Sequence, residues 1–222
     1  MNRIGLFGGT FNPIHFGHLR SALEVQEGFG LDRIYLIPSA FPPHKETVGI
    51  ADVKDRLEMI RLAAAAHPGF FVSDVELQRQ HLSYTVDTVV HFKSSCPKDC
   101  RLYLIMGLDA FQEIDTWKSY LDLFDLIPII VMTRPQSQPD PEHSGQERLD
   151  LFLQSRISSQ YQYSAAQSAY IHPAWQPVHL FAVTSFAISS TRIRQSVKKG
   201  RSIKFLVPEN VARFITARGL YL

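Results

Sequence analysis

The sequence predicts an α/β protein with a mainly parallel, doubly wound sheet in three layers. Short apolar runs of strand length alternate along the chain with stretches of helical periodicity. Residues 1–40 have the pattern strand, helix, strand, and such a crossover joins parallel strands. Residues 102–106, Leu-Tyr-Leu-Ile-Met, are apolar throughout, as a parallel strand is when helices cover both of its faces.

Length and composition set the limits of the organisation. A chain of 222 residues suits one domain with a sizeable core. We expect that domain over residues 1–222, with a variable insertion at about 136–176 and a C-terminal helical segment at about 189–222. The 45% hydrophobic and 20% charged residues are typical of a soluble globular enzyme.

Three classes of protein are not expected. The net charge of +2 is too small to predict binding to a nucleic acid polymer. No apolar run approaches the ~20 residues of a membrane span. Met1-Asn2-Arg3 leads directly into a strand pattern rather than a signal peptide, so the cytoplasm is the expected location.

Local start and stop signals define the helices of the first half. A helix from Gly17 should end at Gly30, because glycine readily adopts the left-handed conformation found at helix ends. Asp52 can cap a helix whose apolar positions 53, 57, 60 and 64 share one face. Ser83 can cap a third helix. Strands are expected around these helices at 4–7, 33–38, 70–73, 102–106, 127–132 and 178–183.

Three helices are expected in the second half. The insertion is rich in Gln, Ser and Pro and contains a short helix at about 147–157, to which no chemistry can be assigned. A second helix has a Ser or Thr cap near residue 189 and ends at Gly200. The closing helix has Pro208 near its start and Gly219 near its end.

Residues 5–18 form a candidate anion site. Gly8 and Gly9 follow the first strand, and glycines let backbone N–H groups approach a ligand closely. Pro13 fixes the next turn, and His15 and His18 fall where the helix begins. A helix N-terminus carries free N–H groups and partial positive charge, so phosphate is the expected anion. A Gly-Gly pair alone would be an ordinary turn, but this combination within fourteen residues favours function.

A basic run near the C-terminal end is a second candidate. Six basic residues and no acid fall within thirteen positions. They are Arg192, Arg194, Lys198, Lys199, Arg201 and Lys204. The run is either a solvated helix face or, in its first part, a phosphate clamp. The preceding Ser189-Ser190-Thr191 favours the clamp, because it places a capped helix N-terminus there.

Further candidates follow predicted strands, where open α/β sheets bind ligands. A rigid proline pair would hold His44 and Lys45 beyond the strand at 33–38, or these residues are incidental charges of a surface loop. Asp109 follows the strand at 102–106 and could bind a ribose hydroxyl or cap a helix. Trp117 could stack on an aromatic base or belong to the core. Arg134, after the strand at 127–132, could pair with a phosphate or carboxylate.

The two cysteines, Cys96 and Cys100, carry no clear chemistry. No other cysteine is present and no histidine pair stands at the usual spacing, so a structural zinc site is not expected. In a cytosolic protein we expect free thiols, with a disulfide as the alternative.

Two segments resemble the signatures of the nucleotidyltransferase superfamily. Residues 8–18 resemble its GGTFDPIHxGH motif, with HxGH as His15-Phe16-Gly17-His18. Residues 188–194, Ile-Ser-Ser-Thr-Arg-Ile-Arg, resemble its I-S-S-T-x-I-R motif. The sequence departs from the family pattern at two positions. Asn12 stands where the superfamily more often has Asp, and Gln136 stands in place of the Gly in the common Arg-Pro-Gly.

The motifs between these signatures are similar to those of bacterial nicotinate-nucleotide adenylyltransferases. They are Pro-Pro-His-Lys at 42–45, Ser-Tyr-Thr at 83–85, and Gly-x-Asp at 107–109 followed by Trp117. The resemblance implies a Rossmann-like fold and adenylyl transfer from ATP to nicotinate mononucleotide, giving deamido-NAD and pyrophosphate.

The resemblance also implies roles for individual residues. Catalytic residues would be His15, His18 and Arg194. ATP contacts would be Gly8, Gly9, Thr10, Phe11, His15, His18, Ser189, Ser190, Thr191 and Arg194. Nicotinate mononucleotide contacts would be His44, Lys45, Thr85, Asp109, Trp117 and Arg134. No residue would ligate a metal, because Mg²⁺ would be held by the ATP phosphates and water.

The implied chemistry needs no Ser or Cys nucleophile, since the attacking group is already a phosphate anion. The work is positioning and charge neutralisation. Alternative functions are a nicotinamide mononucleotide or phosphopantetheine adenylyltransferase, a cytidylyltransferase, or a nucleotide-binding regulator without catalysis. The choice between nicotinate and nicotinamide, and the possible homo-oligomer, are not readable from the sequence.

Overall fold

The computed structural model describes residues 2–40, 49–79, 82–97, 99–133 and 144–222. Within them, eight strands form one sheet in the order β3-β2-β1-β4-β5-β8-β7-β6. The strands are β1 (Arg3–Gly9), β2 (Arg33–Pro38), β3 (Phe70–Val72), β4 (Arg101–Gly107), β5 (Ile129–Thr133), β6 (Gln162–Ser164), β7 (Ala169–Ile171) and β8 (Val178–Ala182). The first five and β8 are parallel, whereas β6 and β7 continue the edge as antiparallel strands.

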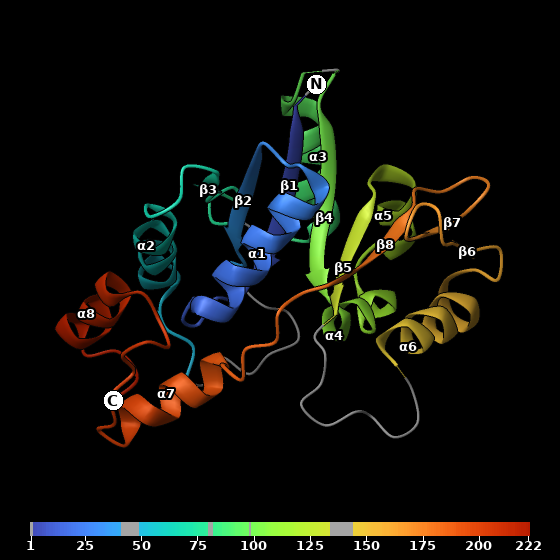
Figure 1. Cartoon of the computed structure of the whole chain (residues 1–222). Helices are drawn as coiled ribbons and strands as arrows, with labels where there is room; N and C mark the ends of the chain where they lie inside the picture. The colour runs from blue at the N-terminus through green and yellow to red at the C-terminus, as the bar shows by residue number, and fades with distance from the viewer. Residues whose placement is uncertain (1, 41–48, 80–81, 98, 134–143) are drawn as a thin grey trace.

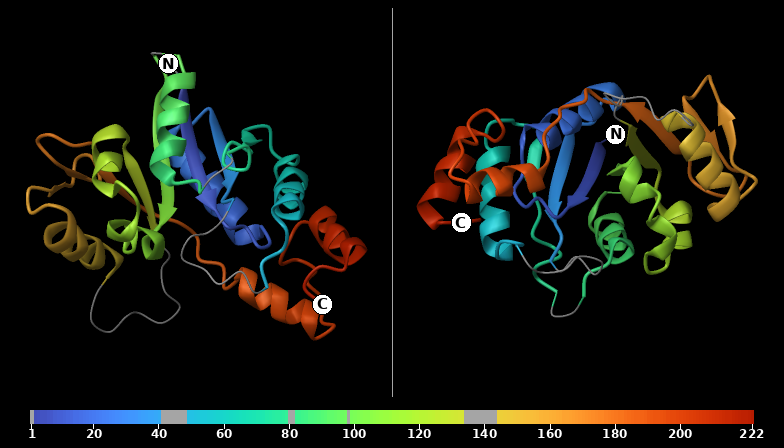
Figure 2. Two further views of the ribbon diagram at one scale, coloured as in Figure 1. Left: turned by 180° about the vertical axis from the view of Figure 1, so that it is seen from behind. Right: turned by 90° about the horizontal axis from the view of Figure 1, so that it is seen from below.

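Helices cover both faces of this sheet, with α1 on one side and α3 on the other (Figures 1 and 2). The α-helices are α1 (Phe16–Phe29), α2 (Val53–Ala64), α3 (Thr85–Ser95), α4 (Leu108–Phe111), α5 (Tyr120–Leu126), α6 (Gly145–Phe152), α7 (Ser190–Lys198) and α8 (Glu209–Arg218). A 3-10 turn, η1 (Ile114–Thr116), precedes α5, and a π turn, η2 (Leu153–Ile157), continues α6. None of the described helices is long and apolar enough to cross a membrane.

The sheet is doubly wound, as predicted. The chain moves outward from β1 to β2 and β3, then returns and moves the other way through β4, β5 and β8. The direction therefore reverses between β1 and β4. In open α/β sheets, ligands bind outside the carboxyl ends of the strands at this point. In Figure 1 the arrow of β4 points towards the side on which α4 and α7 lie.

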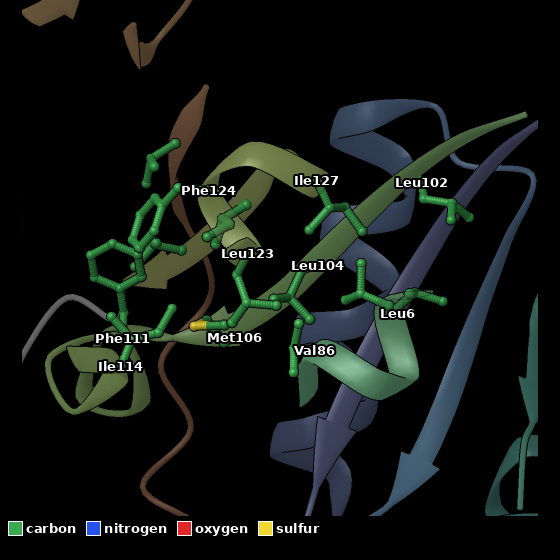
Figure 3. Packing of buried hydrophobic residues seen from close by; sticks show 14 of the residues in the cluster. Leu6, Val86, Leu102, Leu104, Met106, Phe111, Ile114, Leu123, Phe124 and Ile127 are labelled. Atoms are coloured by element: carbon green, nitrogen blue, oxygen red, sulfur yellow. The ribbon is translucent and has the colours of Figure 1, made fainter. Parts of the chain in front are cut away.

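Alternating residues of the central strands build two hydrophobic cores. Leu104 and Met106 of β4 belong to the first cluster, together with Val86 of α3 (Figure 3). Tyr103 and Ile105 of the same strand belong to the second cluster, with α1, α2 and α8. Successive side chains of a strand point to opposite faces, so an apolar strand supplies both cores.

Most of the predicted helix ends are confirmed. Gly30 and Gly219 end α1 and α8 with left-handed φ values of 56° and 60°. Asp52 caps α2 by accepting a hydrogen bond from the Lys54 N–H at 2.8 Å. Ser189 caps α7 by accepting one from the Arg192 N–H at 3.2 Å.

One predicted cap is wrong. Tyr84, not Ser83, occupies the N-cap position of α3, and its side chain makes no capping hydrogen bond. The buried Ser83 hydroxyl instead accepts a hydrogen bond from the Arg79 guanidinium. The hydroxyl is therefore engaged by a charged donor, and such hydrogen bonds are about twice as strong as neutral ones.

The segment predicted as an insertion contributes to the sheet. The expected short helix is present as α6 and η2, but the hairpin of β6 and β7 was not predicted. Two buried tyrosines make hydrogen bonds within this segment. The Tyr161 hydroxyl donates to the Gln176 carbonyl at 2.9 Å, and the Tyr170 hydroxyl donates to the Gln146 carbonyl at 3.2 Å.

Cys96 and Cys100 are half-buried free thiols between α3 and β4. Burial and the hydrogen bond with Cys96 raise the pKa of the Cys100 thiol to about 11. That thiol is therefore protonated and weakly nucleophilic at neutral pH.

Candidate active site

Two glycines leave open space on either side of the point where the strand order reverses. Gly8 lies near the end of β1 and Gly107 ends the neighbouring β4. A Cβ atom built on either residue would meet no protein atom within 4 Å. Packing within the protein therefore does not require glycine at these positions. Close approach of a ligand to both backbones would require it.

His15 and His18 form a stacked pair at the start of α1. Their ring centroids lie 3.7 Å apart with an angle of 22° between the planes. His15 is only 3% exposed, whereas His18 is half-buried. The His15 N–H donates to His18 Nδ1 at 3.3 Å, so the proton of the neutral His18 ring is on Nε2. Nε2 is then the ring nitrogen of His18 that carries a donor N–H.

Gly17 lies close to the His15 ring of this pair. A Cβ atom at Gly17 would lie 3.0 Å from both Cε1 and Nδ1 of the His15 ring. Any larger residue would displace the buried ring, because distances of this size are below normal carbon contacts. The glycine between the histidines thus serves the placement of His15.

The hydrogen bonds of loop 10–13 bring the two signature segments together. The Ser190 hydroxyl donates to the Pro13 carbonyl at 2.9 Å. Arg194 Nη1 donates to the Asn12 carbonyl at 2.9 Å, and its Nη2 donates to the Thr191 hydroxyl at 3.4 Å. The N-terminus of α7 is therefore adjacent to the loop that leads into α1.

The two helices that meet at this loop differ from the others in charge. In the part of the chain that the structure describes, α1 and α7 are the α-helices without an acidic residue in the first turn. The other α-helices carry one each: Asp55, Asp87, Asp109, Asp122, Glu147 and Glu209. Acids normally stabilise helix N-termini, so their absence leaves two partial positive charges for an external anion.

Arg56 of α2 also binds loop 10–13, and the sequence did not predict this role. Its side chain is 2% exposed. Nη1 donates to the Thr10 carbonyl at 2.8 Å, Nη2 to the Ser39 carbonyl at 2.8 Å, and Nε to the Ala51 carbonyl at 3.2 Å. Burial lowers the pKa of this guanidinium, and the three carbonyls compensate for its lost hydration. Arg56 thus ties the ends of β1 and β2 to α2.

The Asn12 side chain is fixed by three partners. Its Oδ1 accepts hydrogen bonds from the Ala51 N–H at 3.0 Å and from the Tyr221 hydroxyl at 2.7 Å. Its Nδ2 donates to the Gly49 carbonyl at 3.0 Å. An aspartate at this position could keep the first two contacts but would place an oxygen against the Gly49 carbonyl. The departure from the superfamily pattern is therefore matched to its surroundings.

Phe11 lies in a strained conformation next to Asn12. Its φ is 46°, in the left-handed region that residues other than glycine rarely adopt. The side chain is buried, with its ring centroid 5.1 Å from that of His18 and 5.6 Å from that of Phe7. Of the predicted ATP contacts, Phe11 can therefore offer its backbone but not its ring, whereas Gly9 and Thr10 are half-buried at the end of β1.

A separate depression lies beside the N-terminus of α3. Its volume is about 550 Å³, and its lining includes Arg79, Tyr84, Asp87 and Lys118. The Lys118 ammonium lies 4.5 Å from the centroid of the Tyr84 ring and 3.8 Å from the Asp87 carboxylate. The predicted contacts Thr85 and Trp117 are chain neighbours of Tyr84 and Lys118. These contacts bring the two segments together.

A buried polar network supports this depression. The Thr88 hydroxyl donates to Glu76 Oε1 at 2.9 Å and accepts from Arg79 Nη1 at 2.9 Å. Burial raises the pKa of Glu76, although Thr88 and Arg79 act against the shift. The network holds the N-terminal turn of α3 against the loop that follows β3.

Asp109 was predicted to contact nicotinate mononucleotide, and its charged neighbour within the protein is Arg148. Its carboxylate is 99% exposed, and it lies 3.9 Å from Arg148 Nη2 of α6. Arg148 also donates to Gln112 Oε1. The segment to which the sequence assigned no chemistry thus places a cation at the carboxyl end of β4. Trp117 is half-buried and packs against the first hydrophobic cluster.

Four predicted positions lie outside the described residues. They are His44, Lys45, Arg134 and Gln136. Within the described residues, no group of three or more His, Cys, Asp or Glu side chains could hold a metal ion.

Sequence comparisons agree with this arrangement. The sequence model described as Cytidylyltransferase-like matches residues 6–196. The chain is 41% identical over 222 residues to a probable nicotinate-nucleotide adenylyltransferase of Desulfatibacillum aliphaticivorans, covering 99% of this chain and 100% of that one. It is 39% identical over 219 residues to a protein of the same name from Geotalea daltonii, covering 99% and 98%.

Structural comparison supports the fold. Nicotinic acid mononucleotide adenylyltransferase of Plasmodium falciparum, in complex with NaAD, matches with a TM-score of 0.72 and 16% identity, covering 100% of this chain and 98% of that one. A putative nicotinate-nucleotide adenylyltransferase of Vibrio parahaemolyticus matches with a TM-score of 0.61, 16% identity and coverage of 100% and 96%. The Rossmann-like nucleotidyltransferase fold predicted from the sequence is therefore confirmed, and the chain belongs to the nicotinate-nucleotide adenylyltransferase family of Cytidylyltransferase-like proteins.

Proposed function

We propose that the chain transfers the adenylyl group of ATP to nicotinate mononucleotide, giving deamido-NAD and pyrophosphate. The observation that carries the proposal is the meeting of two helix N-termini without acids, those of α1 and α7, at loop 10–13. A triphosphate supplies the negative charge that this place lacks. The names of relatives that match the full length support the same reaction.

The reaction is an in-line displacement at the α-phosphorus of ATP. A phosphate oxygen of the mononucleotide forms the new P–O bond, the bond from the α-phosphorus to the bridging oxygen breaks, and pyrophosphate leaves with the bonding electrons. The attacking oxygen is already anionic, so no proton has to be removed. Negative charge grows on the leaving group, and His18 Nε2–H, Arg194 and the N-terminus of α7 are assigned to stabilise it.

The metal assignment follows the same logic. Mg²⁺ takes oxygen ligands in octahedral geometry and keeps several waters, so a triphosphate can carry it without a protein cage. The absence of acids from the first turns of α1 and α7 fits an ion held by phosphates. When bound, Mg²⁺ would neutralise charge between the phosphates.

The acceptor side is assigned to the depression at the N-terminus of α3 and to the neighbouring Thr85, Asp109 and Trp117. Lys118 and Arg79 supply positive charge for one phosphate group. The indole of Trp117 offers a face for the pyridine ring. The cytoplasmic location and the homo-oligomer stay predictions.

The test is pyrophosphate release from ATP, with nicotinate mononucleotide, nicotinamide mononucleotide and phosphopantetheine supplied as acceptors in parallel. We expect release with nicotinate mononucleotide and little with phosphopantetheine. Release with phosphopantetheine alone would show that the assignment is wrong, and no release with any acceptor would favour a regulator without catalysis.

A further inference from the structure

Tyr221 lies outside both signature segments, but it contacts loop 10–13, which is part of the first one. Its hydroxyl donates to Asn12 Oδ1 at 2.7 Å, across 209 positions of sequence. The side chain is half-buried after α8, and its φ of 66° lies in the left-handed region. A residue that combines a strained backbone with a long-range hydrogen bond is a candidate for function.

We propose that Tyr221 is a positioning residue for adenylyl transfer, which acts through Asn12 to hold loop 10–13 in the conformation that the triphosphate binds. The inference rests on the function proposed above. It adds a residue from the segment after α8 to a site otherwise built from β1, α1, α2 and α7.

Asn12 transmits this contact because each of its polar groups has a partner. The amide oxygen accepts from Tyr221 and Ala51, and the amide nitrogen donates to the Gly49 carbonyl. The backbone carbonyl of Asn12 accepts from Arg194 Nη1 at 2.9 Å. One residue thus links Tyr221 to the guanidinium that is assigned to the phosphates. Loss of the Tyr221 hydroxyl would leave the amide held only by Gly49 and Ala51, which belong to one segment.

The surroundings keep the Tyr221 hydroxyl in its donating form. Burial raises the pKa of this hydroxyl above its ordinary value of 10, and the nearby Asp55 acts in the same direction. The positive charges of Arg194 and Arg56 act against the shift. The neutral hydroxyl has one proton, and Asn12 Oδ1 accepts it.

Tyr161 offers a matched control for the loss of a tyrosine hydroxyl. It is fully buried, its hydroxyl donates to the Gln176 carbonyl at 2.9 Å, and burial raises its pKa as well. It lies in the first hydrophobic cluster, on the face of the sheet opposite to α1 and α2. Tyr161→Phe therefore removes one structural hydrogen bond without a connection to Asn12.

The experiment compares Tyr221→Phe with Tyr161→Phe in steady-state pyrophosphate release. We expect Tyr221→Phe to lower kcat by about tenfold, because small displacements of positioning groups are costly in rate. The KM for nicotinate mononucleotide should stay within about twofold. Tyr161→Phe should keep kcat within about twofold of the wild type, even where its melting temperature falls as much as that of Tyr221→Phe.

A double variant and a measurement without turnover complete the test. Adding Tyr221→Phe to Asn12→Ala should lower kcat no further, because the hydroxyl acts through that side chain. Hydrogen exchange of the amides in residues 9–18 should be faster in Tyr221→Phe and unchanged in Tyr161→Phe.

The outcomes separate this inference from the function on which it rests. An inactive wild type would overturn the function. Normal kcat in Tyr221→Phe, an equal loss in both single variants, or unchanged exchange in residues 9–18 would overturn the positioning role. Selective loss of kcat with faster exchange in Tyr221→Phe supports it.

Discussion

The two sides of the site handle charge differently. At loop 10–13, the N-termini of α1 and α7 meet without an acid in either first turn. At the ends of β3 and β4, the N-termini of α3 and α4 carry Asp87 and Asp109, which lie near Lys118 and Arg148. The first side keeps its positive charge free of acids, whereas on the second side Asp87 and Asp109 offset part of the charge of Lys118 and Arg148.

This difference fits the charges of the two proposed substrates. ATP brings a triphosphate, and the mononucleotide brings one phosphate with neutral hydroxyls and a ring. A helix N-terminus interacts with a nearby anion by about 0.3–1 kcal/mol. A carboxylate of the protein in the first turn would satisfy the helix and compete with the ligand. On the proposed function, the absence of acids from α1 and α7 favours binding of the triphosphate at a cost in the stability of these helices.

The largest expected effect comes from removing the histidine donor on the triphosphate side. His18→Ala should lower kcat by roughly 10²–10³, the scale for losing one transition-state donor. The measurement is pyrophosphate release at saturating substrates. His91→Ala in α3, an exposed histidine, is the control and should keep normal turnover. Near-normal kcat in His18→Ala would exclude His18 from the mechanism.

A second variant would give α7 the acid that the other helices have. Thr191→Asp should raise the KM for ATP by about tenfold. The new carboxylate would interact with the positive charge of the α7 N-terminus and of Arg194, and would compete there with the triphosphate. The same change should stabilise the free protein by about 0.3–1 kcal/mol in thermal unfolding.

Opposite signs in activity and stability are the signature of this prediction. Gln195→Glu adds the same charge to α7 beyond its first turn and should change the KM for ATP much less. If both variants raise the KM equally, net charge rather than the helix N-terminus is responsible.

A third variant concerns the acceptor side. Trp117→Ala should raise the KM for nicotinate mononucleotide by about 2- to 10-fold, the range for loss of one aromatic contact. The KM for ATP should change less. Trp117 also packs against the first hydrophobic cluster, so the melting temperature has to be measured in parallel. Equal increases in both KM values would contradict a stacking role.

The smallest effect concerns pH and the network below the depression. Burial raises the pKa of Glu76, so folding favours its protonated form. The stabilisation is complete below the ordinary pKa of 4.5 and is lost as the pH rises through the raised value. Glu76→Gln removes this titration while an amide oxygen can still accept from Thr88.

Thermal unfolding of Glu76→Gln and the wild type between pH 4 and 7 tests this sign. The stability of the variant relative to the wild type should increase as the pH rises. A difference that is constant over this range would show that Glu76 does not titrate with folding.

The sequence predicted the elements whose signals are local and strong. The central strand at 102–106, the caps at Asp52 and Ser189, and the stop at Gly30 all appear as expected. The hairpin of β6 and β7 was missed because each strand has three residues and β6 is largely exposed. Tyr161 beside the hairpin and Tyr170 of β7 are buried, and no local pattern reveals that burial.

In the candidate site, the signature segments were predictable from the sequence and the residues that support them were not. Its motifs predicted which segments meet, and the hydrogen bonds of Ser190 and Arg194 with loop 10–13 place them together. The supporting residues were not predictable. Arg56 resembles any charged residue beside an apolar stripe, and Tyr221 resembles an ordinary aromatic residue after a helix. Only the folded chain shows that both contact the surroundings of one loop.

The contacts that hold loop 10–13 come from distant parts of the chain. Asn12 binds residues 37 to 209 positions away, and Pro13 binds Ser190 across 177 positions. The candidate anion site therefore depends on the docking of α2, α7 and the segment after α8 on the sheet. On the proposed function, binding of ATP and docking of these segments are thermodynamically linked. At 100 times its Kd, ATP would add about 2.7 kcal/mol to the unfolding free energy of the whole chain, and not of the loop alone.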